Sequence, residues 1–175
     1  MADESKKSWG LLKPIAIAII LAALVRYLLF THILVDGHSM MPILKNNDHL
    51  IVCKVCYAIG KPHRFDIVIF HATKRTDYIK RVIGLPGETI EYRDDVLYVN
   101  GKPVKEPYLN KYKAATTGLL TNNFKTKVPK GTVFVLGDNR RISRDSRFIG
   151  AIPVDEIIGK AVLSFWPPSE IKVIH

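Results

Sequence analysis

Two apolar runs decide the fold of this chain: FDIVIF at residues 65–70 and YIKRVI at residues 78–83. Short runs of this length, rich in β-branched and aromatic residues, are typical of buried β-strands. The second run ends at Gly84-Leu85-Pro86-Gly87, a segment of turn-forming residues. We therefore expect both runs to be strands of a sheet, with Lys80 inside the second strand.

The same strand pattern continues on both sides of this pair. Further strands are predicted at 33–35, 50–57, 89–92, 96–99, 132–136 and 159–165. The 89–92 and 96–99 segments predict a hairpin, and Asn100-Gly101 marks a second tight turn. Residues 153–158 resemble a short turn or helix, and the polar segment 110–127 predicts a long exposed loop or a small excursion. These elements together predict a mainly β fold with a partly closed antiparallel sheet.

The N-terminal part has a different composition from the rest. Within 175 residues, enough for about one domain, the segment Ile15 to Val25 is wholly apolar. The 18 residues from Lys13 to Phe30 reach the lower limit for crossing a bilayer. A cleaved signal peptide would need an Ala-x-Ala-like site, which is missing here, and a buried globular helix would have a polar face. We therefore predict a polar tail at 1–13, one transmembrane helix at 14–31 and a domain at 32–175.

Basic residues suggest how this helix is oriented and what the domain contacts. Lys6, Lys7 and Lys13 precede the apolar segment, which favours a cytoplasmic N-terminus and an extracytoplasmic domain. Arg26 is tolerable near the outer end, because its side chain can extend to the headgroups. The net charge of +10 fits either a lysine-rich solvated surface or attraction to anionic membrane lipid. No aromatic-basic stripe or nucleic-acid motif accompanies the charge, so we expect no nucleic-acid partner.

The two cysteines form a single Cys53-x-x-Cys56 motif with no second pair of metal ligands. We expect no zinc site and, more generally, neither a metal nor a cofactor. If residues 50–57 form one strand, side chains three residues apart point to opposite faces. This makes a disulfide within the motif a poor fit and favours two ordinary thiols.

The candidate chemistry lies in GHSMMP at residues 37–42 and in Lys80. A serine hydroxyl needs a neighbouring base to act as a nucleophile, and lysine can be that base when desolvation lowers its pKa. Ile79, Val82 and Ile83 surround Lys80 with apolar groups. Alternation along the strand places Lys80 and Arg81 on opposite faces, so one can point into a site while the other points away.

A histidine could replace lysine as the base, since Ser-His-Asp arrangements are common. His38 adjoins Ser39, and adjacent side chains on an extended chain diverge. The sequence does not exclude His32, His49, His63 or His71 by position, although no Gly-x-Ser-x-Gly elbow surrounds Ser39.

Three motifs in order resemble those of the type I signal peptidases. They are Ser39-Met40-x-Pro42, then Lys80-Arg81-x-x-Gly84-x-Pro86-Gly87, and then Gly137-Asp138-Asn139-Arg140 followed by Ser143-x-Asp145-Ser146-Arg147. The resemblance runs from the apolar segment to Trp166 and implies a membrane-bound serine endopeptidase that removes signal peptides from secretory preproteins. It implies Ser39 as nucleophile and Lys80 as general base, with small residues required at positions −1 and −3 of the substrate.

The resemblance also implies the supporting residues of such a site. Ser143 would hydrogen-bond the lysine amine, and Asp145 and Arg147 would brace the floor of the site. The backbone N–H of Ser39 would stabilise the oxyanion, and Gly37 stands where some members have a serine that adds a second donor. We expect Met40, Tyr78 and Ile79 to form a shallow substrate pocket that admits alanine. The glycine and the single anchor resemble the Gram-positive branch of the family.

Two other classes share part of this pattern. A self-cleaving repressor-type protease uses the same Ser–Lys chemistry, but it would begin with a DNA-binding helix-turn-helix in place of the apolar segment. A membrane-tethered binding domain without catalysis would have lost the serine or the lysine, and both are present here. Membrane fractionation decides the first alternative and a peptide-cleavage assay the second.

Overall fold

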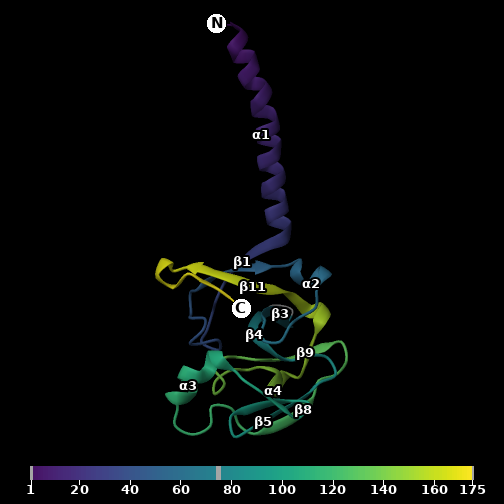
Figure 1. Ribbon diagram of the computed structural model, residues 1–175, viewed down its shortest axis with the longest axis vertical. Helices are drawn as coiled ribbons and strands as arrows, with labels where there is room; N and C mark the ends of the chain where they lie inside the picture. The colour runs from purple at the N-terminus through teal and green to yellow at the C-terminus, as the bar shows by residue number, and fades with distance from the viewer. Residues whose placement is uncertain (1, 74–75, 175) are drawn as a thin grey trace.

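The computed structural model describes residues 2–73 and 76–174, and its chain forms two antiparallel sheets below a long N-terminal helix (Figure 1). The eight-stranded main sheet has the order β1-β2-β11-β3-β4-β9-β10, with β12 paired to β11, and it does not close into a barrel within this described part. Its strands are β1 (Phe30–Leu34), β2 (His49–Cys53), β3 (Ile67–Thr73), β4 (Thr76–Gly84), β9 (Thr132–Leu136), β10 (Ile152–Pro153), β11 (Ile157–Trp166) and β12 (Lys172–Val173).

The four-stranded second sheet has the order β7-β6-β5-β8. Its strands are β5 (Thr89–Arg93), β6 (Val96–Val99), β7 (Lys102–Val104) and β8 (Phe124–Lys127). The short helices that connect the strands are α2 (Cys56–Ile59), η1 (Pro107–Leu109), α3 (Asn110–Ala114), α4 (Ser146–Ile149), η2 (Val154–Glu156) and η3 (Pro168–Glu170).

The centre of the main sheet is the pair of strands predicted from the two apolar runs. β3 and β4 pair antiparallel, with Val68 opposite Lys80 and Ile69 opposite Ile79. β9 then pairs with the other edge of β4, with Leu136 opposite Arg81. This arrangement places residues 137–147, which follow β9, directly beside the middle of β4, where Lys80 lies. Ile67, Val68, Ile69 and Phe70 are fully buried, as expected of a continuous apolar run in a central strand.

Helix α1 (Ala2–Leu29) covers the predicted tail and most of the predicted anchor, and it projects away from the sheets (Figure 1). It ends two residues before the predicted limit of 31, because the chain enters β1 at Phe30. Met1 and the side chains of residues 2–12, including Lys6 and Lys7, lie outside the described residues. Over the residues that are described, no helix combines the length and the apolarity that a membrane crossing requires.

Several strand predictions are confirmed, including the hairpin of β5 and β6 and the strand β9. The prediction for residues 110–127 is partly confirmed, since the segment leaves the main sheet but contains α3 and ends in β8, which pairs with β5. Residues 153–158 include η2, as expected. The strand predicted at 159–165 is β11, but it is longer than predicted and is followed by β12.

The prediction of two free thiols is wrong, because Cys53 and Cys56 form a disulfide. β2 ends at Cys53, and Cys56 begins helix α2. The alternation of a strand therefore does not apply between the two residues, and the chain bends enough to bring their Cα atoms to 5.6 Å. The predicted strand at 50–57 is correspondingly too long at its end.

Candidate active site

Ser39 lies on the connection between β1 and β2, and two backbone hydrogen bonds fix the position of this connection. The Val35 N–H donates to the Asp48 carbonyl at 2.8 Å and closes the base of the connection. The Asn139 N–H donates to the Ser39 carbonyl at 3.0 Å and ties the serine to the segment after β9. Gly37 adopts a φ of +99°, in the left-handed region that favours glycine, and its N–H donates to Asn46 Oδ1 at 2.8 Å.

Lys80 of β4 reaches this serine across the sheet. Its Nζ lies 2.8 Å from Ser39 Oγ and also donates to the Ile79 carbonyl at 3.0 Å. The side chain is only 3% exposed. Desolvation by this burial lowers the pKa of Lys80 from 10.5 to about 8, against the smaller raising effects of the Asp145 and Asp138 charges. Lys80 and Ser39 therefore have both the contact and the proton affinity that general-base activation of a hydroxyl requires.

Arg81, the next residue of β4, points to the opposite face, as alternation predicts. Its Nε and Nη2 donate to both carboxylate oxygens of Asp138 at 2.8 and 2.7 Å, and its guanidinium stacks over the ring of Tyr108. Burial opposes the charge of Arg81, but the hydrogen bonds and the charge of Asp138 outweigh burial and raise its pKa. Arg81 is thus a permanently charged residue that holds β4 against the segment after β9.

The three predicted supporting residues lie together beside this pair. Asp145 Oδ2 accepts from the Gly137 N–H at 3.0 Å, and Arg147 Nε donates to Asp145 Oδ1 at 2.8 Å. Ser143 is buried, but its Oγ has no hydrogen-bond partner among the described residues, so the bond to the lysine amine implied by the resemblance is not formed. The lysine amine is instead engaged by Ser39 Oγ and the Ile79 carbonyl.

Gly137 explains why this segment can approach the serine so closely. A Cβ at this position would lie 2.2 Å from Ser143 Oγ and 2.5 Å from the Ser39 carbonyl oxygen. Any larger residue would push the segment after β9 away from Ser39. The glycine of the third motif therefore has a steric role in assembling the site.

A second buried cation links this segment to the four-stranded sheet. Arg140 is 1% exposed, and its Nη2 donates to Glu106 Oε1 at 2.6 Å while its Nη1 donates to Tyr92 Oη at 2.7 Å. Its Nε donates to the Gly137 carbonyl at 3.0 Å. Arg140 and Asp138 belong to the third motif, but the sequence alone assigns them no role, and Glu106 was not predicted to contribute to the site. No local pattern marks Glu106, because its partner lies 34 residues away.

An open cavity of about 540 Å³ lies over the Ser39–Lys80 pair. Met40, Tyr78 and Ile79, the predicted pocket residues, all line it together with Ser39 and Lys80. Its remaining walls include Ile33, Leu34, Val35, Asp36, Gly37, His38, Ile69, Asp77, Ile142 and Arg144. Among the described residues, His38 is the one histidine that lines this cavity, and its ring forms no hydrogen bond with Ser39, whose Oγ is bonded to Lys80 Nζ.

Two further properties of the cavity bear on its chemistry. Within residues 2–73 and 76–174, the backbone N–H of Ser39 donates to no protein acceptor, so it is available to a bound ligand. Over the same residues, no three His, Cys, Asp or Glu side chains gather in an arrangement that could hold a metal ion. The cavity thus presents a hydroxyl, a buried amine and a backbone donor side by side.

Comparisons with known proteins agree with this geometry. The family model described as "Signal peptidase, peptidase S26" matches residues 8–166. The chain is 47% identical over 172 residues to a signal peptidase I of Bacillus caldolyticus, covering 94% of both chains. It is 42% identical over 170 residues to signal peptidase IB of Staphylococcus aureus (strain COL), covering 90% of this chain and 89% of the relative.

A solved structure extends the similarity to the fold. The crystal structure of a signal peptidase I from Enterococcus faecalis V583 superposes with a TM-score of 0.56 at 42% sequence identity, covering 58% of this chain and 97% of the other. A mainly β antiparallel fold carrying a serine–lysine pair defines the class as a peptidase. The chain belongs to the signal peptidase family, which confirms the resemblance drawn from its three motifs.

Proposed function

We propose that this chain is a membrane-bound serine endopeptidase that removes N-terminal signal peptides from secretory preproteins with a Ser39–Lys80 dyad. The observation that carries the proposal is the 2.8 Å contact between Lys80 Nζ and Ser39 Oγ, made by a buried lysine whose pKa is lowered to about 8. A substantial fraction of such a lysine is neutral near pH 8, and only the neutral amine can accept the serine proton.

In the reaction, the neutral Lys80 amine takes the proton from Ser39 Oγ as this oxygen attacks the carbonyl carbon of substrate residue −1. The negative charge that develops on the carbonyl oxygen is stabilised by the backbone N–H of Ser39. Gly37 has no side chain to add a second donor. The C–N bond then breaks, the Lys80 ammonium returns the proton to the leaving amine, and an ester to Ser39 remains. A water molecule, deprotonated by Lys80, hydrolyses the ester and regenerates the hydroxyl.

Substrate selection follows from the cavity walls. Met40, Tyr78 and Ile79 line the space beside the nucleophile, and we expect them to admit alanine and other small residues at −1 and −3 and to disfavour larger side chains. Asp145 and Arg147 lie behind the cavity walls and hold the segment after β9 in place through Gly137. Their role is to position the dyad, and they make no hydrogen bond to its reacting atoms.

Helix α1 is the part of the chain that places this site at a membrane. Its described side chains from residue 15 to residue 25 are apolar and exposed, with Ile19 and Ile20 at 63% and 65% exposure. Exposure of so much apolar surface on one isolated helix is favourable in a bilayer and costly in water. A cytoplasmic N-terminus and an extracytoplasmic domain agree with the lysines before the apolar segment. Preproteins whose own apolar segments lie in the same bilayer are the substrates that this arrangement can meet.

The test compares Ser39→Ala with Ser164→Ala on a panel of preproteins that carry Ala-x-Ala sites. Ser164 is a buried β11 serine whose Oγ has no partner among the described residues. Ser164→Ala therefore removes the same hydroxyl group as Ser39→Ala, but at a position outside the cavity. We expect Ser39→Ala to lower kcat/KM by at least about 10⁴-fold while the protein stays folded in the membrane fraction. The Ser164→Ala variant should cleave like wild type. Residual turnover by Ser39→Ala within tenfold of wild type would remove Ser39 from the mechanism.

A further inference from the structure

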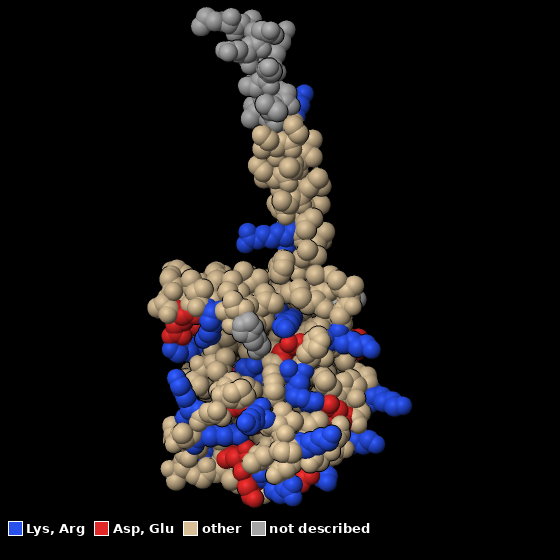
Figure 2. Space-filling model, in the orientation of Figure 1, with Lys and Arg blue, Asp and Glu red and all other residues tan. Residues whose placement is uncertain are grey.

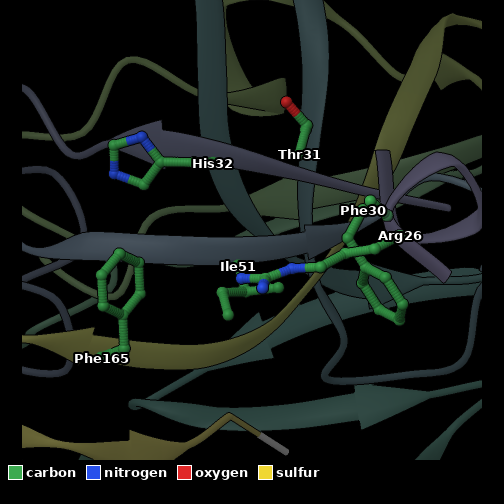
Figure 3. Close-up of a pocket in the computed structure, with 7 residues that line it drawn as sticks. Arg26, Phe30, Thr31, His32, Ile51 and Phe165 are labelled. Atoms are coloured by element: carbon green, nitrogen blue, oxygen red, sulfur yellow. The ribbon is translucent and has the colours of Figure 1, made fainter. Parts of the chain in front are cut away.

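A second cavity, of about 760 Å³, lies where helix α1 meets the main sheet, apart from the cavity over Ser39 (Figure 3). The residues that line it come from four elements, α1, β1, β2 and β11. They are Ala23, Arg26, Phe30, Thr31, His32, Ile51 and Phe165. Neither Ser39 nor Lys80 contributes to its walls, so the proposed peptidase reaction gives it no role.

The floor of this cavity is an apolar and aromatic surface on the outer face of the sheet. Register places Ile51 of β2 directly opposite His32 of β1, which puts their side chains on one face. The rings of His32 and Phe165 pack edge to face with centroids 5.5 Å apart. Phe30 is 37% exposed, although it lies in a strand of the main sheet. The floor therefore offers several side chains to an apolar ligand.

Arg26 supplies a positive charge above this floor. It lies in the last turn of α1, and Figure 3 shows its side chain extending toward the middle of the lining residues, with Phe30 on one side and His32 and Phe165 on the other. No Asp or Glu is among the described residues that line the cavity, and Arg26 forms no ion pair with any described residue. A guanidinium without a carboxylate partner, held over an apolar surface, suits a phosphate oxygen pair in bidentate geometry.

The position of the cavity selects among phosphate-bearing ligands. Figure 2 shows that the end of the domain around the base of α1 is mostly free of charged side chains, whereas lysines, arginines and carboxylates are scattered among uncharged residues over the rest of the visible face. If α1 crosses the bilayer as proposed above, Arg26 near its outer end lies at the level of the lipid headgroups. A ligand here meets a cation and an adjoining apolar floor, which match the phosphate and the first acyl carbons of a phospholipid.

We propose that this cavity is a binding site for one anionic phospholipid, with its phosphate on Arg26 and its acyl chain across Phe30, Ile51 and Phe165. The proposal rests on the membrane placement of α1 in the proposed function. An anionic headgroup is favoured over a zwitterionic one, because a choline or amine cation would oppose the charge of Arg26. Bound lipid fills the angle between helix and sheet, and so links the orientation of the domain to the membrane surface.

Native mass spectrometry of the full chain released from nanodiscs tests this site. The nanodiscs contain phosphatidylcholine with a minor share of phosphatidylglycerol, and the variants are Arg26→Gln and Lys13→Gln. Lys13 is the matched control, since it is an exposed basic residue of the same helix at the other end of the apolar segment. We expect wild type and Lys13→Gln to retain one phosphatidylglycerol per chain, and Arg26→Gln to retain about tenfold less. Millimolar inorganic phosphate should not displace the lipid, because it cannot occupy the apolar floor.

Equal retention by Arg26→Gln and wild type would overturn the site, and so would equal losses in both variants, which indicate general charge attraction. Displacement of the lipid by inorganic phosphate would assign the site to a free anion and overturn the proposal that it binds a phospholipid. Cleavage of a water-soluble signal-peptide substrate by the same wild-type preparation separates the two proposals. If this peptide is cleaved and no lipid is retained, only the lipid site fails. If lipid is retained and the peptide is not cleaved, the peptidase assignment fails.

Discussion

The two faces of strand β4 carry neighbouring cations with opposite electrostatic outcomes. Lys80 and Arg81 are each 3% exposed, so both have lost nearly all contact with solvent. The pKa of Lys80 falls to about 8 through desolvation, whereas the pKa of Arg81 is raised despite its burial. The difference is the partner: Asp138 accepts two hydrogen bonds from Arg81, while Lys80 contacts a hydroxyl and a carbonyl.

Burial alone therefore does not decide what a cation can do. A buried cation becomes a base when nearby carboxylates act only at a distance, and it becomes a structural charge when a carboxylate bonds to it directly. The 137–147 segment supplies both conditions, since Asp138 pairs with Arg81 and Asp145 is held by Arg147 and Gly137. The same segment thus holds Arg81 in its charged form on one face of β4 and leaves Lys80, on the other face, without a bonded carboxylate.

The largest expected effect comes from replacing Lys80 by a residue that stays charged, as Arg81 does on the opposite face of β4. Lys80→Arg replaces an amine that can lose its proton by a guanidinium that stays charged near neutral pH. We expect kcat/KM for a preprotein substrate to fall by at least about 10⁴-fold, as it should in Lys80→Met. Lys127→Arg, at an exposed position of β8, is the matched control and should cleave like wild type. An active Lys80→Arg enzyme would return the histidines to consideration as the base.

A second effect is expected from removing the carboxylate that pairs with Arg81. Asp138→Asn leaves the buried guanidinium of Arg81 without its countercharge and should lower the free energy of unfolding by about 3–5 kcal/mol. Chemical denaturation of the full chain in neutral detergent measures this value. Asp155→Asn, which removes a carboxylate from an exposed position, should change it by less than about 0.5 kcal/mol. Equal effects of the two substitutions would mean that the Arg81–Asp138 pair does not stabilise the fold.

A smaller effect is a dependence of the free energy of unfolding on pH, which follows from the lowered pKa of Lys80. Between pH 8 and 10.5 the unfolded chain keeps a proton on Lys80 that the folded chain has lost, so stability rises with pH across this window. Below about pH 8 the folded protein bears the whole cost of the buried ammonium, which is about 3 kcal/mol for this shift in pKa. Lys80→Met lacks this dependence.

The measurement is the difference in unfolding free energy between Lys80→Met and wild type at pH 7 and at pH 11. We expect the advantage of Lys80→Met to shrink by about 3 kcal/mol over this range. Using the difference removes the contribution of buried tyrosines such as Tyr92, whose pKa burial raises. A constant difference would mean that Lys80 has an ordinary pKa in the folded protein.

Much of the fold was predictable from the sequence, because the central strands are continuous apolar runs with clear turns after them. The opposite directions of Lys80 and Arg81 were also predictable, since alternation along a strand is fixed by local geometry. The partners of Arg81 and Arg140 were not, because Asp138 and Glu106 lie 57 and 34 residues away and meet them only through the pairing of the sheets. The disulfide prediction failed for a related reason: nothing local marks the end of β2 at Cys53.

The site was predictable in its two central residues and less so around them. Ser39 and Lys80 lie in contact as expected, and Met40, Tyr78 and Ile79 line the same cavity. The hydrogen bond expected from Ser143 is not formed, and the steric role of Gly137 depends on backbone positions that no residue pattern encodes.

The central claim is that burial without a bonded carboxylate makes Lys80 the base, and the pH dependence of kcat/KM tests it most directly. We predict a rising limb near pH 8 in the wild-type enzyme, where the lysine loses its proton. Ile79→Ser should admit water beside the amine and move this limb to higher pH, whereas Ile142→Ser, which changes an exposed wall of the same cavity, should leave it in place. A limb near the ordinary histidine value of about 6.5, unchanged in Ile79→Ser, would contradict the account.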